Sequence, residues 1–452
     1  MYLYSIKNKY YIIFYRSTEE HIFKKVSIKL GGQGSRGQSK RPFQIVLNDG
    51  DELYNRDKFK LRNIVKDCTG IKNKIVIDIG NAIGLPSTQS GFARFYLNDY
   101  AFGLYDLSDV MKKKYIRYNF HKGNKDAKYG ILYKGKGFQN VMRAYLMRNP
   151  EFYVQMFSIK NFETDYDEDD QMIDSEKSRE LIEFIDWIYD VLPNTSIKNI
   201  EKSFDIDTFL KTVALEYLVE HRDGFLNTGN NYFIYKTYED KRYHVWSYDY
   251  DNTFKSSPED TFNEFEKIYN YGKNIAFNSM AEELLDCIYN PLAERIFIHN
   301  EFRERFNKII SEIVIKIFNK DVLGKRILFL KDVIRNDLKW DSLVPRVATQ
   351  YAGLSEATRY TWNEINEAFN PNATGQTCSG KDSNLLTFID TRYNIVINEF
   401  NITTNQIEAI KNKTNSHGYI GSRIDSENAA LPNMNFSILI TIFLIFTIYI
   451  LI

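Results

Sequence analysis

Four oxygen-bearing side chains in residues 217–254 have the types and order that chemistry on phosphate groups requires. Asp223 lies in a loop after a predicted helix, and Asn231 begins a predicted strand. Asp249 and Asp251 directly follow a second strand. Carboxylate and amide oxygens are the ligands that Mg²⁺ and Mn²⁺ prefer. In phosphoryl transfer, one carboxylate orients the attacking hydroxyl and others hold metal across the phosphates.

Two strands must position these side chains, one predicted over residues 231–235 and one over residues 243–246. With a charged turn between them they form a hairpin, and the two open ends of a hairpin lie side by side. Both acidic loops leave from that open end, so the four side chains are expected to converge. Taken singly, each has a simpler explanation as a turn, cap or loop residue.

The triplet His221-Arg222-Asp223 matches the HRD of conventional protein kinases, but its surroundings differ. The conventional motif places an asparagine five residues after the aspartate, where this chain has Thr228. No DFG occurs, and the front of the chain has no conventional glycine-rich loop. The pattern therefore argues against an ordinary protein kinase.

The remaining pattern predicts an α+β fold, strand-rich in the first third and helix-rich after residue 205. Strand patterns at residues 43–47 and 93–97 flank a helical pattern over residues 71–83. Further on, Asp207 is expected to cap a helix, and an apolar stripe predicts a buried helix at residues 302–317. Lysine plus arginine equals aspartate plus glutamate at 59 each, which argues against nucleic-acid binding.

Five elements, in order, resemble the spore-coat-protein-H (CotH) family of atypical kinases. They are residues 34–43 (GSRGQSKRPF), the KLR and GLP of residues 60–62 and 84–86, residues 97–105 (LNDYAFGLY), DG with NNYFIY at residues 223–224 and 230–235, and W with DYD at residues 246 and 249–251. The resemblance covers about residues 30–254, with looser helical similarity to about residue 340. It departs from the family pattern at Gln38 and in the two-residue gap after Trp246.

The resemblance implies a two-lobed, kinase-like fold that uses ATP and Mg²⁺ or Mn²⁺ to phosphorylate Ser/Thr hydroxyls of proteins. It assigns Asp223 as the catalytic base and Asn231, Asp249 and Asp251 as metal ligands. Asp109, which we include among the cofactor-binding residues, replaces a family glutamate and is expected to form a salt bridge that is one methylene shorter. The candidates for the cofactor-binding cation, which we leave unranked, are Lys40, Lys60, Arg62 and Lys134.

The C-terminus ends in a hydrophobic tail over residues 436–452 that contains no charge. The small residues Asn428-Ala429-Ala430 and a short spacer precede it, an order typical of a glycosylphosphatidylinositol (GPI) signal with Asn428 as attachment site. Choosing Ser426 would lengthen the spacer, and a tail-anchored helix is the alternative. A lipid anchor requires secretion, but the first residues lack a signal-peptide pattern, so we expect the true start upstream.

We therefore expect a membrane-anchored protein on the extracellular cell surface, divided into five segments. These are an N-terminal segment (1–29), the CotH-like domain (30–345), a helical extension (346–410), a polar stalk (411–435) and the tail (436–452). Three cysteines, Cys68, Cys287 and Cys378, allow at most one disulfide within the chain. A catalytically weak adhesin or invasin that binds a host or wall protein remains the alternative to a kinase.

Overall fold

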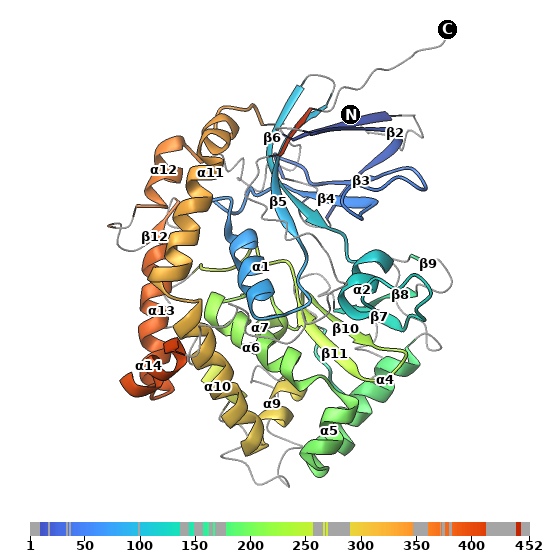
Figure 1. Cartoon of the computed structure of the whole chain (residues 1–452), viewed down its shortest axis with the longest axis vertical. Helices are drawn as coiled ribbons and strands as arrows, with labels where there is room; N and C mark the ends of the chain where they lie inside the picture. Colours follow the sequence, from blue (N-terminus) through green and yellow to red (C-terminus); the bar gives the residue numbers. More distant parts are fainter. Residues whose placement is uncertain are drawn as a thin grey trace.

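The computed structural model divides into a strand-rich part and a helix-rich part (Figure 1). It describes residues 10–16, 19–32, 35, 38–97, 100–135, 144–148, 157–161, 166–167, 178–255, 265–266, 268–269, 290–346, 360–370, 372, 376–378, 382–412 and 440–443. The predicted α+β class is confirmed, with the sheets drawn mainly from the first half of the chain.

A closed barrel forms the strand-rich part, with the order β1-β14-β5-β6-β4-β3-β2. Its strands are β1 (Tyr10–Arg16), β2 (Glu19–Leu30), β3 (Phe43–Val46), β4 (Lys58–Arg62), β5 (Ser90–Leu97), β6 (Tyr100–Asp109) and β14 (Ile440–Phe443). Alternation along β4 buries Phe59 and Leu61 in the barrel core and leaves Lys58, Lys60 and Arg62 on the opposite face. That face carries the cations described below.

The helical pattern over residues 71–83 forms α1 (Lys72–Ala82), with Ile71 and Ile83 as its caps. The helix ends because Gly84 adopts a left-handed backbone (φ 77°), which glycine reaches without steric cost. Its apolar residues pack against β5 and against α6 (Ile206–Val219), so α1 connects the barrel to the helical part.

A second sheet, in the order β11-β10-β7-β8-β9, lies beside the helices (Figure 1). Its strands are β7 (Ile131–Gly135), β8 (Phe157–Asn161), β9 (Tyr166–Asp167), β10 (Tyr232–Lys236) and β11 (Tyr243–Ser247). The predicted hairpin is confirmed, because β10 and β11 pair antiparallel with Tyr232 opposite Ser247 at the open end.

Helices complete the fold around this sheet. They are α2 (Lys113–Phe120), α4 (Arg179–Asp186), α5 (Ile197–Ser203), α7 (Phe225–Thr228), α9 (Pro291–Phe297), α10 (Asn300–Lys316), α11 (Lys325–Asp341), α12 (Trp362–Glu367), α13 (Leu385–Glu399) and α14 (Thr404–Asn412), with short turns η3 (Trp187–Val191), η4 (Leu192–Asn194) and η5 (Lys320–Gly324) and the small hairpin β12 (Gln376–Thr377) and β13 (Asp382–Ser383). The predicted stripe on α10 is buried as expected. The cap of α6 is Asp205, not Asp207: its carboxylate accepts a hydrogen bond from the backbone N–H of Thr208.

Much of the predicted C-terminal anchor lies outside the described residues, including Asn428 and Ser426. Of the hydrophobic tail, Ile440–Phe443 is described, as strand β14 between β1 and β5. Among the described helices, none combines the length and apolar character needed to cross a bilayer. The segment boundaries stay predictions, although residues of α13 share one buried cluster with α6 and α10.

A disulfide joins Cys68, just before α1, to Cys378, in the turn between β12 and β13. The two cysteines are 310 residues apart in sequence and both are buried. The bond ties the C-terminal extension to the part of the chain that leads into α1. Disulfides persist in oxidising compartments, so this pairing agrees with a protein that enters the secretory route.

We expect the double variant Cys68→Ser/Cys378→Ser to lose about 2–5 kcal/mol of unfolding free energy, because the unfolded chain regains the freedom that the cross-link removes. Urea unfolding followed by circular dichroism measures the loss. Cys287→Ser, which leaves the bond intact, is the matched control. Equal unfolding midpoints for the double variant and the control would contradict this role.

Candidate active site

The loop between α6 and α7 carries the first of the four side chains. Glu220 ends α6 in a left-handed conformation (φ 53°), which turns the chain so that Asp223 faces the open end of the hairpin. The side chain of Asp223 is about one-third exposed, and its Oδ1 lies 3.5 Å from Nε2 of His221. Among the described residues this oxygen has no hydrogen-bond partner. Oδ1 is thus a buried carboxylate oxygen with no hydrogen bond, in a side chain that is partly open to solvent.

The hairpin brings the other three side chains to Asp223, as expected from the sequence. The side-chain amide of Asn231 donates a hydrogen bond to the backbone oxygen of Asp223 (3.0 Å). The backbone oxygen of Asn231 in turn accepts a hydrogen bond from the backbone N–H of Tyr248 (2.9 Å). His221 contacts the backbone oxygen of Asp249 through Nε2 (3.1 Å). Asp249 has a left-handed backbone (φ 66°) that marks the sharp turn out of β11.

Two cations from β4 face the acidic pair. The guanidinium of Arg62 donates a hydrogen bond to Oδ1 of Asp249 and lies 3.5 Å from Oδ2 of Asp251. Nζ of Lys60 lies 3.8 Å from Oδ2 of Asp249. Lys134 on β7 lies over the ring of Tyr248, 5.2 Å from its centroid. Three of the four cations named from the sequence, Lys60, Arg62 and Lys134, therefore act electrostatically on the carboxylate of Asp249.

The electrostatics follow from this crowding. Although burial favours the neutral acid, Arg62 and Lys60 hold the pKa of Asp249 well below its usual range. Partial burial and the neighbouring charge of Asp249 raise the pKa of Asp251 to about 6, against the attraction of Arg62. Burial also raises the pKa of Asp223, although His221 opposes the shift. One acid is firmly ionised, and the other two hold protons more readily than usual.

Lys40 lies elsewhere, at the contact between the barrel and the end of α11. Its buried ammonium donates hydrogen bonds to the backbone oxygen of Leu104 and to Asp341 (2.8 Å). Asp341 also accepts from Arg346 (2.7 Å) and from the backbone N–H of Leu104 (2.7 Å). Burial lowers the pKa of Lys40 to about 8 despite the attraction of Asp341. The structure therefore shows Lys40 bonded between structural elements, with no contact to the acidic cluster among the described interactions.

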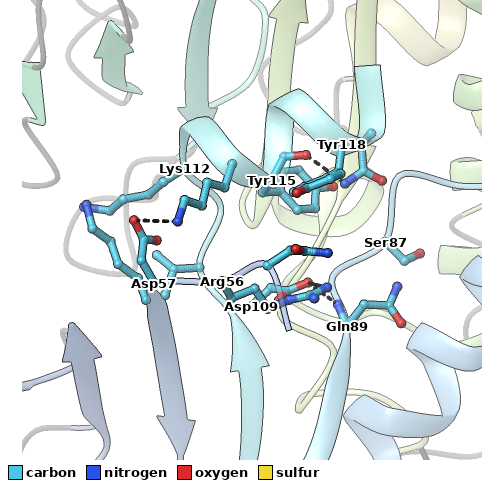
Figure 2. Close-up of a pocket in the computed structure, with 13 residues that line it drawn as sticks. Arg56, Asp57, Ser87, Gln89, Asp109, Lys112, Tyr115 and Tyr118 are labelled. Atoms are coloured by element: carbon cyan, nitrogen blue, oxygen red, sulfur yellow. Dashed lines mark hydrogen bonds and ion pairs between the residues drawn. The ribbon is translucent and has the colours of Figure 1, made fainter. Parts of the chain in front are cut away.

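Asp109 forms the expected salt bridge, and its partner is Arg56. Two guanidinium nitrogens of Arg56 reach the carboxylate, which also accepts from the backbone N–H of Gln89 (2.8 Å). Figure 2 shows these residues in a solvent-open pocket between the start of β4, the end of β6 and helix α2. The empty volume of this pocket, open solvent included, is about 510 Å³. Lys58 also lines this pocket and shares a strand face with Lys60 and Arg62. This strand face leads from the pocket to the acidic cluster.

Glu216 is a positioning residue that the sequence analysis missed. It is buried on α6 and accepts hydrogen bonds from the backbone N–H groups of Phe225 and Leu226 (2.8 Å each) and from Ser247. Its Oε1 also lies 3.4 Å from Nδ1 of His221. One carboxylate thus ties α7, the end of β11 and His221 together. The available signal was a charged residue among the apolar residues of a buried helix.

Gly224 permits this close packing. A Cβ atom there would lie 2.4 Å from Nδ1 of His221 and 2.6 Å from Oε1 of Glu216. Those distances are too short for any side chain, so the loop after Asp223 requires glycine at this position.

The oxygen atoms of Asn231, Asp249 and Asp251 are of the type that a hard divalent cation prefers. The Arg62 guanidinium lies between the two carboxylates. In the described part of the chain, no three His, Cys, Asp or Glu side chains are placed to hold a metal ion. The carboxylate of Asp249 is directed at Arg62. The amide nitrogen of Asn231 is used by Asp223, which leaves its carbonyl oxygen as a possible ligand. The side chains of Asn231, Asp249 and Asp251 therefore carry oxygens of the kind that such a metal prefers.

Comparison with known proteins gives one family for most of the chain. The model of the family described as CotH kinase protein matches residues 28–396. Invasin CotH2 of Rhizopus delemar is 26% identical over 402 residues, covering 87% of this chain and 63% of that protein. Invasin CotH3 of the same organism is 26% identical over 411 residues, covering 87% and 62%. The chain thus spans less than two thirds of the length of these invasins.

A bacterial relative extends the similarity. Inner spore coat protein H of Bacillus subtilis is 21% identical over 325 residues, covering 69% of this chain and 78% of that protein. The matched region of the family model includes Asp223, Asn231, Asp249 and Asp251, which the structure brings to one place.

We expect Glu216→Ala to lower the unfolding free energy by about 2–4 kcal/mol, because it leaves two buried backbone N–H groups without an acceptor. Glu216→Gln keeps an acceptor oxygen and should lose less. Chemical denaturation of the purified variants measures the difference. Glu201→Ala removes a more exposed helix carboxylate that pairs with Arg305, and should cost about 1 kcal/mol or less. Equal losses for Glu216→Ala and Glu201→Ala would contradict the structural role of Glu216.

Proposed function

Because this chain belongs to the CotH kinase protein family, we propose that it transfers phosphate from ATP to Ser/Thr hydroxyls of secreted or cell-surface proteins. The observation that carries the proposal is the convergence of Asp223 with Asp249 and Asp251 at the open end of the β10–β11 hairpin, facing the cations of β4. Phosphoryl transfer needs a base beside the acceptor and cations around the phosphates, and in this proposal Asp223 and the cations of β4 fill these two roles.

Asp223 acts as the catalytic base in this proposal. Its side chain is about one-third exposed, and its buried Oδ1 takes no hydrogen bond from the described residues, so in this proposal the carboxylate orients the acceptor hydroxyl and takes its proton. Asn231 fixes the backbone of Asp223 from the hairpin side, and His221 contacts both acidic loops. The base is thus held by the same elements that carry Asp249.

Asn231, Asp249 and Asp251 would hold Mg²⁺ or Mn²⁺, which when bound neutralises negative charge on the nucleotide phosphates. Lys60, Arg62 and Lys134 supply positive charge on the same side of the cluster. Burial and the charge of Arg62 lower the pKa of Lys60 to about 8. A phosphate group beside Lys60 would favour its charged form and be bound by it. We assign Lys40 and Asp109 a structural part in this proposal, since each is bonded elsewhere.

We propose a location at the cell surface on the basis of the relatives and the cysteines. Two similar proteins are named invasins, a name that fits a role at the cell surface. The buried disulfide and four exposed Asn-x-Ser/Thr sites, at Asn194, Asn372, Asn401 and Asn412, support passage through the secretory pathway. We also propose a C-terminal membrane anchor, attached at Asn428 if it is a lipid; either kind of anchor requires residues 440–443 to leave their place as β14 in the barrel.

We expect the full chain with Mg²⁺ or Mn²⁺ to transfer labelled phosphate from ATP to itself or to casein. Asp223→Asn should reduce transfer by about 10²–10⁴-fold with little change in nucleotide affinity, because it removes the base and keeps the phosphate contacts. Asp251→Asn should weaken binding of nucleotide with metal, measured by calorimetry. Asp126→Asn, an exposed acid after α2, is the control. No transfer by the wild type, together with unchanged binding in Asp251→Asn, would refute the kinase proposal.

An adhesin is the second candidate, favoured by the invasin names of two relatives. If the chain acts by binding a host or wall protein, Asp223→Asn protein should bind candidate partner cells as well as the wild type does. Flow cytometry with labelled protein measures this binding. Loss of adhesion in the Asp223→Asn protein, with the fold intact by circular dichroism, would count against a role independent of catalysis.

A further inference from the structure

The Arg62 guanidinium sits where two carboxylates that would hold a metal ion approach each other. It donates to Asp249 and lies 3.5 Å from Asp251, so one positive group contacts both acids. An arginine side chain keeps its charge at any pH at which the protein is folded. The acidic pair is therefore already neutralised in part before any ligand arrives.

The surroundings hold Arg62 in this position. Its strand, β4, is paired on both sides, with β3 and β6, so its backbone has little freedom to move. The residue opposite it on β6 is Asp106, a second buried acid whose carboxylate accepts hydrogen bonds from three neighbours: Asn73, Ser90 and Ser108. Asp106 attracts Arg62 electrostatically, while the guanidinium donates its hydrogen bond to Asp249. The side chain of Arg62 is only 12% exposed.

If Asp249 and Asp251 are to hold a divalent cation, they would have to offer it carboxylate oxygens that Arg62 now contacts. Metal alone offers the displaced guanidinium no new acceptor, and a buried cation without a partner is costly. Nucleotide phosphates do offer one, because guanidinium pairs readily with phosphate oxygens. Metal and nucleotide should therefore bind with strong mutual dependence.

We propose that Arg62 is an internal counter-ion that keeps divalent metal from the Asp249–Asp251 pair until nucleotide phosphates arrive to accept its hydrogen bonds. This inference rests on the proposed function. It adds that metal and nucleotide each bind tightly only when the other is present. Lys60 differs from Arg62 because its ammonium is farther from Asp249, at 3.8 Å, and more exposed. It is therefore the matched comparison on the same strand face.

The test is Mn²⁺ binding, followed by electron paramagnetic resonance of free Mn²⁺, to the full-length wild type, Arg62→Gln and Lys60→Gln. Without nucleotide, Arg62→Gln should bind Mn²⁺ at least about tenfold more tightly than the wild type, and Lys60→Gln should change far less. With a non-hydrolysable ATP analogue, Mn²⁺ affinity should rise at least about tenfold for the wild type and change little for Arg62→Gln. Arg62→Lys, which keeps the charge but not the planar donor pair, should lie between them and serves if Arg62→Gln fails to fold.

The outcomes separate this inference from the proposed function. The counter-ion role would be overturned if Arg62→Gln bound Mn²⁺ no more tightly than the wild type in the absence of nucleotide. The same outcome in Arg62→Lys would decide if only that variant folds. The kinase proposal would still stand in either case, provided that the wild type binds Mn²⁺ with the ATP analogue. Absence of Mn²⁺ binding in every protein, with and without the analogue, would overturn both. A similar gain in Mn²⁺ affinity in Lys60→Gln and Arg62→Gln would also overturn the inference, because removal of any nearby positive charge would then explain the effect.

Discussion

The antiparallel pairing of β10 with β11 is the interaction on which the acidic site depends. It sets Tyr232 opposite Ser247, and that register fixes where the chain enters the hairpin and where it leaves. The loop with Asp223 and the loop with Asp249 therefore meet at one end. A shift by one residue would turn every side chain of the strand to the other face of the sheet.

Glu216 holds these two loops in place relative to each other. A single buried carboxylate satisfies two N–H groups at the start of α7 and the hydroxyl at the end of β11. Such a charge is stable in the interior only because it is fully hydrogen-bonded. The hydrogen bonds that offset the cost of burying it also fix the two loops that carry the acidic cluster.

Local patterns were enough to predict the elements of the site. The hairpin, the helix before Asp223 and the helix over residues 71–83 each follow from periodicity and turn residues close in sequence. The convergence of the acidic loops then followed from hairpin geometry alone. The same reasoning was wrong about the cap of α6. Asp205 and Asp207 are equally good caps by residue type, and the point at which the backbone becomes helical decides that Asp205 is the cap.

Long-range partners were beyond the sequence. Lys40 and Lys60 look alike as candidate cations, but Lys40 meets Asp341, 301 residues away, whereas Lys60 faces Asp249. Burial decides such pairings, and it is a property of the assembled fold. Three cysteines permitted three pairings, and only the fold selects Cys68 with Cys378. Glu216 was missed because a glutamate on a helix is most often exposed.

The disulfide also determines how the protein responds to proteolysis. A chain closed on itself between Cys68 and Cys378 remains one covalent molecule after a single cut anywhere inside that span. The span contains Asp223, Asn231, Asp249 and Asp251, and Arg62 lies just before it. Outside a cell, where proteases are common and reductants scarce, a nicked molecule would keep its two fragments joined, and with them the helices and strands around the site.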